Sequence, residues 1–211
     1  MRIKIWLTMR LIKKLVRAFN QKVLFCDLDG TLIVTKSGKI FPENEDDWKF
    51  KEHIKEAICE YNPKYIFILT NQGGIEKGYV DEKRFIAKMN TIMREMRGWG
   101  DFIVDGVYCK SNNPNDLFRK PNVGMVDHFR YCYNFDNRRA LMIGDASGLQ
   151  GQFSDTDLRC AKLAGIRYCD VNHFIEAMHP CLFCQLGQCC AGEYPCAMDE
   201  FKRARLRKVI L

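Results

Sequence analysis

The chain has 211 residues, of which 47% are hydrophobic and 28% are charged, and its formal net charge is +7. This composition is typical of a globular domain with a full-sized core, and it excludes fibrous and wholly disordered chains. The apolar runs are far shorter than the roughly 18 residues that a membrane-spanning helix needs, so we expect no transmembrane segment.

The distribution of charged residues along the sequence predicts three segments. Residues 1–22 hold seven basic residues and no acidic one, and 201–208 hold five basic residues, which leaves 21 basic against 26 acidic residues elsewhere. We therefore divide the chain into a basic amphipathic extension (1–21), a central domain (22–178), and a Cys-rich segment with a basic tail (179–211). Basic ends favour an anionic partner. For the extension, DNA contact, membrane docking and organelle targeting all remain open.

In the central domain, short apolar runs alternate with segments of helical period. Strands are predicted over 23–26, 65–69, 102–109, 140–143 and 166–169, and helices over 50–61, 81–97, 124–134 and 156–164. Asp81 is a plausible N-cap, and Thr35–Lys39 indicates a hairpin tip after the first strand. This alternation predicts an α/β fold of the three-layer α/β/α, Rossmann-like kind with a parallel sheet.

Polar residues gather at the predicted strand ends, where ligands of such sheets bind. The motifs are Asp27-Leu28-Asp29-Gly30-Thr31, Thr70-Asn71-Gln72, Arg119-Lys120-Pro121 and Gly144-Asp145. Carboxylates that share a site repel each other unless a cation lies among them, and an all-oxygen set favours Mg²⁺. Each motif alone could be an ordinary turn or cap. Their conjunction at strand ends favours a catalytic site.

The order of these motifs resembles the haloacid dehalogenase superfamily of phosphotransferases, from about residue 23 to 174. The resemblance implies an aspartyl-phosphate mechanism in which Asp27 is the nucleophile and Asp29 the general acid and then base. It further implies that Thr70 holds phosphoryl oxygens and that Lys120 neutralises charge. Mg²⁺ is implied on Asp27, on Asp145 and on the backbone carbonyl of Asp29.

A finer resemblance is to the 3′-phosphatase domain of polynucleotide kinase/phosphatase enzymes. It rests on Leu32–Pro42 with Asp47-Trp48, on Arg119-Lys120-Pro121, and on Gly144–Gly148 with Asp157. It implies removal of 3′-phosphate from DNA or RNA ends in nucleic-acid end repair, with Asp157 near the metal through water. The short segments between motifs leave room only for a hairpin flap, so the site is expected to be uncapped.

Several further residues are expected to contact substrate. They are Gly30, Thr31, Asn71, Gln72, Lys36, Lys39 and Arg119. Gly30 would free a backbone amide for a phosphoryl oxygen. For Lys36 and Lys39, a solvated hairpin tip is the alternative to a contact with backbone phosphate.

Two other functions stay open. A small-molecule phosphatase of the histidinol-phosphate or heptose-bisphosphate type would carry the same Thr-Asn-Gln and Arg-Lys-Pro motifs, although those heptose enzymes usually have a Cys-rich zinc loop, and here 101–119 holds only Cys109. A non-catalytic nucleic-acid-binding module would be expected to lack one of the carboxylates. No Gly-x4-Gly-Lys-Ser/Thr motif occurs in the chain, so we expect no kinase activity.

The chain has eleven cysteines, five of them within 181–196. Arg10, Lys13 and Lys14 interrupt any signal-peptide core, so we expect a cytoplasmic or nucleic-acid-containing compartment rather than secretion. The spacing within the cluster is compatible with structural Zn²⁺, and a thiol-rich buried turn is the alternative. The candidate zinc ligands are Cys181, Cys184, Cys189 and Cys196.

Overall fold

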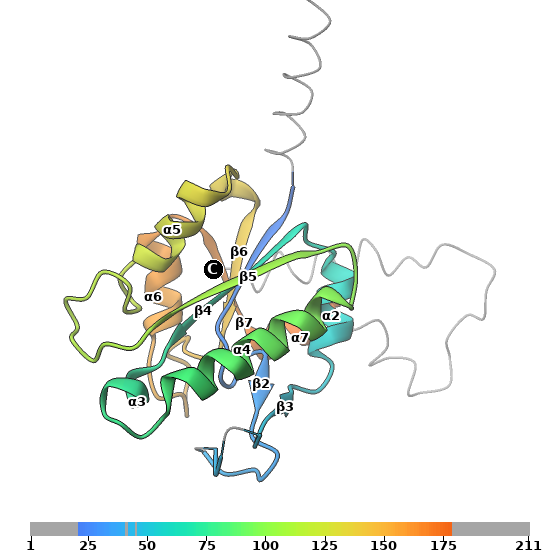
Figure 1. The fold of residues 1–211 in the computed structure, drawn as a ribbon. Helices are drawn as coiled ribbons and strands as arrows, with labels where there is room; N and C mark the ends of the chain where they lie inside the picture. The colour runs from blue at the N-terminus through green and yellow to red at the C-terminus, as the bar shows by residue number, and fades with distance from the viewer. Residues whose placement is uncertain (1–20, 41, 45, 179–211) are drawn as a thin grey trace, which may run out of the picture.

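The computed structural model describes residues 21–40, 42–44 and 46–178. Five parallel strands form its central sheet (Figure 1), in the order β5-β4-β1-β6-β7. They are β1 (Val23–Cys26), β4 (Tyr65–Asn71), β5 (Ile103–Cys109), β6 (Ala140–Gly144) and β7 (Arg167–Asp170). Because β1 pairs with β4 on one side and β6 on the other, the residues that follow these three strands are brought together.

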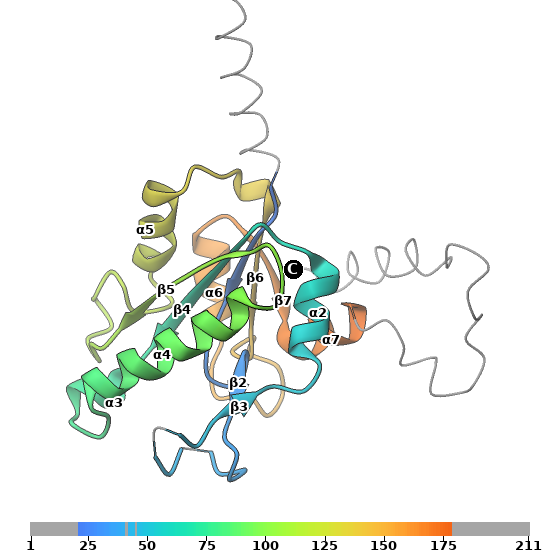
Figure 2. The same cartoon turned by 45° about the vertical axis from the view of Figure 1, so that its right-hand side comes forward.

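Helices cover both faces of the sheet (Figures 1 and 2). On one face lie α2 (Ile54–Tyr61), α4 (Glu82–Arg97) and α7 (Val171–Met178), and on the other lie α5 (Gly124–Cys132) and α6 (Thr156–Leu163). A short helix α3 (Gly73–Glu76) follows β4, and a 3₁₀ turn η1 (Asn137–Arg139) precedes β6. The predicted three-layer α/β/α fold is confirmed.

Both cores are built by the side chains that alternate along the strands. In β1, Leu24 and Cys26 join the core beneath α2, α4 and α7, whereas Val23 and Phe25 join the core beneath α5 and α6. On the second face, the rings of Phe67 and Phe129 stack with their centroids 4.1 Å apart. Burial on both faces explains why the strands read as continuous apolar runs rather than alternating ones.

All five predicted strands and four predicted helices are present, with ends shifted by a few residues. Asp81 is the N-cap of α4, and its carboxylate accepts a hydrogen bond of 2.9 Å from the amide of Arg84. The largest shift is in α2, which begins at Ile54 rather than at residue 50 because His53 has a left-handed backbone, with φ 61°. The elements α3, η1 and α7 were not predicted.

The hairpin differs from the predicted one. β2 (Ile33–Val34) pairs antiparallel with β3 (Lys49–Phe50), so residues 35–48 connect the two strands and the tip is longer than Thr35–Lys39. Ile40, which directly follows the predicted tip, does not pack as a core-facing strand residue would, since it is 73% exposed. Phe50 is the better partner because its ring packs edge-on against Trp99, with centroids 4.7 Å apart.

Three predictions fall outside the described residues: the basic extension, the zinc ligands Cys181, Cys184, Cys189 and Cys196, and the basic tail. Within the described part of the chain, no helix has both the length and the apolar character needed to cross a membrane.

Candidate active site

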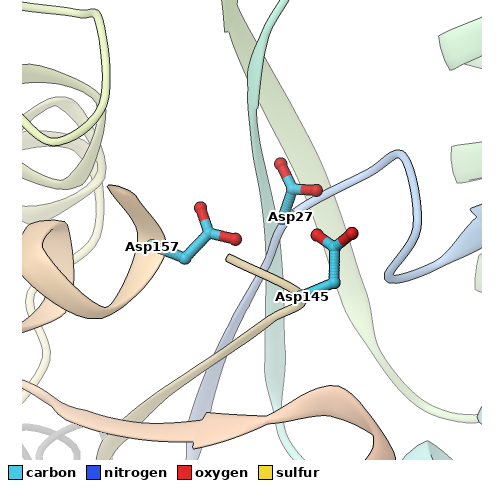
Figure 3. Close-up of side chains that lie close together, drawn as sticks. All are labelled: Asp27, Asp145 and Asp157. Atoms are coloured by element: carbon cyan, nitrogen blue, oxygen red, sulfur yellow. The ribbon is translucent and has the colours of Figure 1, made fainter. Parts of the chain in front are cut away.

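Three carboxylates converge at the carboxyl end of the sheet (Figure 3). Asp27 directly follows β1, Asp145 directly follows β6, and Asp157 lies in the first turn of α6. Each offers one oxygen, and these three oxygens lie within 4.8 Å of one another. An all-oxygen donor set of this size matches the preference of Mg²⁺. Asp157, which the sequence placed near the metal through water, is therefore part of the carboxylate cluster itself.

Lys120 supplies the positive charge at this cluster. Its ammonium forms ion pairs with Asp27 and with Asp157, the latter at 2.8 Å, and donates to the Leu69 carbonyl at 2.8 Å. The Lys120 side chain is 3% exposed and that of Asp157 is 2% exposed. A buried charge is tolerated only when it is paired and hydrogen-bonded, and Lys120 is both.

The carboxylates are short of positive charge even with Lys120 present. Burial raises the pKa of Asp27 well above its usual range, and repulsion from Asp157 and Asp145 adds to this effect, while Lys120 opposes it. Burial, followed by repulsion from Asp157, also raises the pKa of Asp145. Burial alone would lower the pKa of Lys120, but the charges of Asp157 and Asp27 raise it, so the ammonium stays protonated. A divalent cation among the three oxygens would relieve this repulsion.

Two glycines allow the carboxylates to approach so closely. Gly30 has a left-handed backbone with φ 78°, and a Cβ there would overlap the carboxylate of Asp145. A Cβ at Gly144 would likewise overlap the carboxylate of Asp157. These contacts explain why the Asp-Leu-Asp-Gly and Gly-Asp motifs carry glycine at these two positions.

Asp29 and Thr70 lie next to this cluster and are linked through one side chain. The Gln72 amide donates 2.7 Å to Asp29 and 2.9 Å to the Thr70 hydroxyl. Thr70 is buried, whereas the Asp29 side chain is 55% exposed, so the site is open to solvent at Asp29, and we call this position the opening. Since the Thr70 hydroxyl accepts from Gln72, its own proton is left to donate elsewhere. The Asp29 side chain is not one of the three clustered carboxylates.

Four residues expected to contact substrate also make hydrogen bonds within the site, and their contacts with substrate stay predictions. The Asn71 amide exchanges two hydrogen bonds of 2.9 Å with the backbone of Lys120. The fully buried Thr31 donates to Asp145 at 3.4 Å, and Arg119 donates to the Ser111 carbonyl at 2.7 Å.

The fourth is Gly30, whose amide donates a hydrogen bond of 2.8 Å to the Ile33 carbonyl. Asn71 and Thr31 share a reason: a close cluster of charges needs its surroundings fixed, and short polar side chains provide the hydrogen bonds that do so.

The two hairpin lysines are engaged within the hairpin. Lys39 forms an ion pair with Glu43, and Lys36 donates 3.0 Å to the carbonyl of Asp46. Both residues are exposed. Their contacts within the protein are those of a solvated hairpin tip. Their expected contact with backbone phosphate stays a prediction.

A polar network behind Asp145 was not predicted. Asp170, at the end of β7, accepts 2.7 Å hydrogen bonds from Ser147 and from Gln152. The side-chain carbonyl of Gln152 in turn accepts from the amide of Ser147 at 2.7 Å. This network fixes the loop between Asp145 and Asp157. Its members are far apart in the sequence, so no local pattern indicated it.

Two lysines near Asp29 were also missed, namely Lys51 after β3 and Lys88 in α4. Lys88 belongs to an amphipathic helix whose charged residues usually face solvent, and only the packing of α4 shows that this one faces the site. No signal in the sequence separated it from its neighbours.

Comparisons with known proteins agree with this geometry. Residues 22–174 match the family model described as polynucleotide kinase 3 phosphatase. The chain is 31% identical over 154 residues to the bifunctional polynucleotide phosphatase/kinase of Schizosaccharomyces pombe, a match that covers 71% of this chain but 36% of that protein. It is 27% identical over 166 residues to the D-glycero-beta-D-manno-heptose-1,7-bisphosphate 7-phosphatase of Haemophilus ducreyi, covering 70% and 81%.

Solved structures show the same fold. A putative HAD-like phosphatase from Mesorhizobium loti superposes with a TM-score of 0.54 at 26% identity, covering 69% of each chain. The D,D-heptose 1,7-bisphosphate phosphatase from B. bronchiseptica, solved with magnesium and phosphate, gives 0.57 at 19% identity and covers 89% of this chain and 99% of its own. Because the family model matches residues 22–174 of the 211 and the carboxylate–lysine cluster is in place, the chain belongs to the polynucleotide kinase 3 phosphatase family of HAD-like phosphatases.

Proposed function

We propose that this chain is a Mg²⁺-dependent polynucleotide 3′-phosphatase that acts through a phosphorylated Asp27. The observation that carries the proposal is the buried ion pair of Asp27 with Lys120 beside two further carboxylates. A carboxylate can attack a phosphate monoester only where the charge of both is offset, and this cluster is built to offset it.

In the first step, an Asp27 oxygen attacks phosphorus while the bond from phosphorus to the 3′ oxygen breaks. Asp29, at the opening, gives its proton to the departing 3′ oxygen. The Thr70 hydroxyl donates a hydrogen bond to a phosphoryl oxygen, and Lys120 holds Asp27 in place. In the second step, water attacks the phosphorus of the aspartyl-phosphate, Asp29 takes the proton of that water, and Asp27 is released as the carboxylate.

Asp27, Asp145 and Asp157 fit Mg²⁺ as oxygen donors, and the backbone carbonyl of Asp29 would complete the protein ligands. When bound, Mg²⁺ would offset the charge of the phosphoryl oxygens and of the carboxylates. Three residues support the arrangement of these ligands. Gly30 and Gly144 leave room for the acidic side chains to approach one another, and Thr31 donates a hydrogen bond to Asp145.

The opening supports a polymeric substrate. Within the described residues, the only insertion between β1 and α2 is the β2–β3 hairpin, and only the four-residue α3 lies between β4 and α4. Both lie at the end of the sheet toward which the strands run (Figures 1 and 2). A chain end can enter a site that, in the described part of the chain, no second domain closes. The family match also favours polynucleotide, whereas the similarity to heptose-bisphosphate phosphatases keeps a phosphosugar as the second candidate.

Phosphate release decides between these candidates. We expect the purified protein to release phosphate from a 3′-phosphorylated oligonucleotide, but not from the same oligonucleotide phosphorylated at its 5′ end. Release should stop in EDTA and return with Mg²⁺, which Zn²⁺ alone should not replace. Faster release from a heptose bisphosphate or from histidinol phosphate would favour the small-molecule candidate. No release from any substrate would favour the non-catalytic nucleic-acid-binding module.

A further inference from the structure

Two lysines converge on the Asp29–Gly30 turn from different elements. Lys88, in α4, places its ammonium 3.9 Å from a carboxylate oxygen of Asp29, and its side chain is 11% exposed. Lys51, which follows β3, donates 3.1 Å to the carbonyl of Gly30. The two positive charges therefore flank two consecutive residues at the opening of the site.

The burial of Lys88 is not explained by its partners in the protein. Its ammonium lies 5.8 Å from the centroid of the Phe85 ring, which makes a weak contact, and its ion pair with Asp29 is at the outer limit of such pairs. Asp29 already accepts the closer hydrogen bond from Gln72, at 2.7 Å. An ammonium has three donors, so Lys88 keeps donors that these contacts do not use.

Lys51 has a similar surplus of charge. Its ammonium bonds to a neutral carbonyl, and within residues 21–40, 42–44 and 46–178 it forms no ion pair. Its backbone is fixed beside the hairpin, because its amide donates 2.9 Å to the carbonyl of Leu32. The lysines of the hairpin tip differ, since Lys39 is neutralised by Glu43.

The lysine donors at this turn outnumber their acidic partners. Within the described residues, Asp29 is the only carboxylate that forms an ion pair with either ammonium, so both lysines keep donors from which a further anion can accept hydrogen bonds. Neither lysine pairs with Asp27, which is buried and paired with Lys120.

We propose that Lys88 and Lys51 form a subsite for a second phosphate group of the substrate, next to the phosphate that is removed. This inference rests on the proposed function and names a determinant of its specificity. In a polynucleotide, the second phosphate is the one on the 5′ oxygen of the terminal nucleotide. In a sugar bisphosphate, it is the phosphate that is not hydrolysed. Lysine suits either role as a mobile point charge.

The test compares ligands that differ by one phosphate. Thymidine 3′,5′-bisphosphate and thymidine 3′-monophosphate would each compete with the hydrolysis of p-nitrophenyl phosphate by the full-length protein. We expect the bisphosphate to compete about tenfold better with the wild type, the effect of one charge-assisted contact. In Lys88→Met and in Lys51→Met this preference should fall several-fold, and Lys88→Arg should largely restore it.

The matched control is Lys83→Met, an exposed lysine of the same helix, which should keep the preference. If Lys88 only holds Asp29, Lys88→Met will slow p-nitrophenyl phosphate turnover while the preference for the bisphosphate stays unchanged, and that result overturns the subsite. No preference in the wild type would overturn it as well. Should one lysine variant fail to fold, the other still provides the measurement.

A second pair of ligands identifies the source of the phosphate. Fructose 1,6-bisphosphate and fructose 6-phosphate differ by one phosphate on a sugar. If the lysine variants lose the preference for the bisphosphate in the fructose pair but keep it in the thymidine pair, the subsite is supported. The same result would count against a polynucleotide as the substrate. Phosphate release from the 3′-phosphorylated oligonucleotide is measured separately, so the proposed function can fail while the competition data still support the subsite.

Discussion

Asp27 is a buried carboxylate that pairs with Lys120 and is repelled by Asp157 and Asp145. Asp27→Asn keeps the shape of the side chain but removes the nucleophile, so phosphate release should fall by at least about 10³-fold. Melting in the absence of Mg²⁺ should change little, because asparagine keeps the shape of the side chain and Lys120 keeps Asp157 as its ion-pair partner. Asp101→Asn is the control, since the Asp101 side chain is 98% exposed and remote from the cluster. More than a few per cent of residual turnover would contradict the covalent mechanism.

Lys120 has a structural role as well as a catalytic one. Lys120→Met removes the shared partner of two buried carboxylates, and breaking a buried ion pair typically costs about 3–5 kcal/mol. We expect a loss of this size in the free energy of unfolding by urea without metal, together with loss of activity. Lys64→Met should cost less than about 1 kcal/mol, because Lys64 pairs with an exposed Asp101. Equal losses in the two variants would contradict this role for Lys120.

At the scale of elements, the sequence predicts the strands and helices whose pattern follows from burial. It does not predict strand pairing that depends on particular side-chain contacts. The strands of the sheet were predictable because both faces are buried, and α4 because its cap and its apolar stripe agree. The partner of β2 was not predictable. Ile40 and Phe50 are both apolar, and only packing against Trp99 selects Phe50.

The hairpin connection depends on one buried carboxylate, that of Asp47. Hydrogen bonds from the Ser37 hydroxyl and from the amides of Glu43 and Ser37 lower its pKa from 3.8 to about 2. A lowered pKa in the folded state means that the ionised form stabilises the fold. This stabilisation is complete above about pH 4 and is lost as the pH falls toward 2.

Asp47→Ala should therefore lower the Tm at pH 7, and its difference from the wild type should narrow as the pH falls from 4 to 2. Thermal melting followed by circular dichroism at several pH values measures this. Asp46→Ala, at the exposed neighbouring position, serves as the control and should show no comparable narrowing. A difference in Tm that stays constant down to pH 2 would show that the Asp47 charge does not stabilise the hairpin.

At the scale of the whole molecule, the topology explains how much of the site could be predicted. Because β1 lies between β4 and β6, the residues at the carboxyl ends of these strands must meet, and the motifs that contain Asp27, Thr70 and Asp145 stand at those ends. The strand order does not determine where long side chains of other elements reach. Lys51 and Lys88 approach the opening through the packing of a hairpin and a helix, which no spacing in the sequence encodes.

The distribution of charge over the whole chain leads to the last prediction. Residues 1–20 carry six basic residues and no acidic one, whereas the chain between the two basic ends has more acidic than basic residues. A polyanion would be repelled by such a body unless basic segments contact it. If residues 1–20 contact nucleic acid, the affinity for a 3′-phosphorylated oligonucleotide should fall with rising salt, with a log-log slope of about 0.9 per phosphate contacted on duplex DNA.

Deletion of residues 1–20 should then flatten this slope and raise the KM for oligonucleotides. Turnover of p-nitrophenyl phosphate should change little, because Asp27 and its neighbours are untouched. A full-length variant with Arg10, Lys13, Lys14 and Arg17 changed to Gln separates charge from length and should flatten the slope nearly as much. If both variants keep the wild-type slope, the basic segment does not contact nucleic acid. Binding of the full-length protein to anionic vesicles would then test membrane docking, the alternative role for this segment.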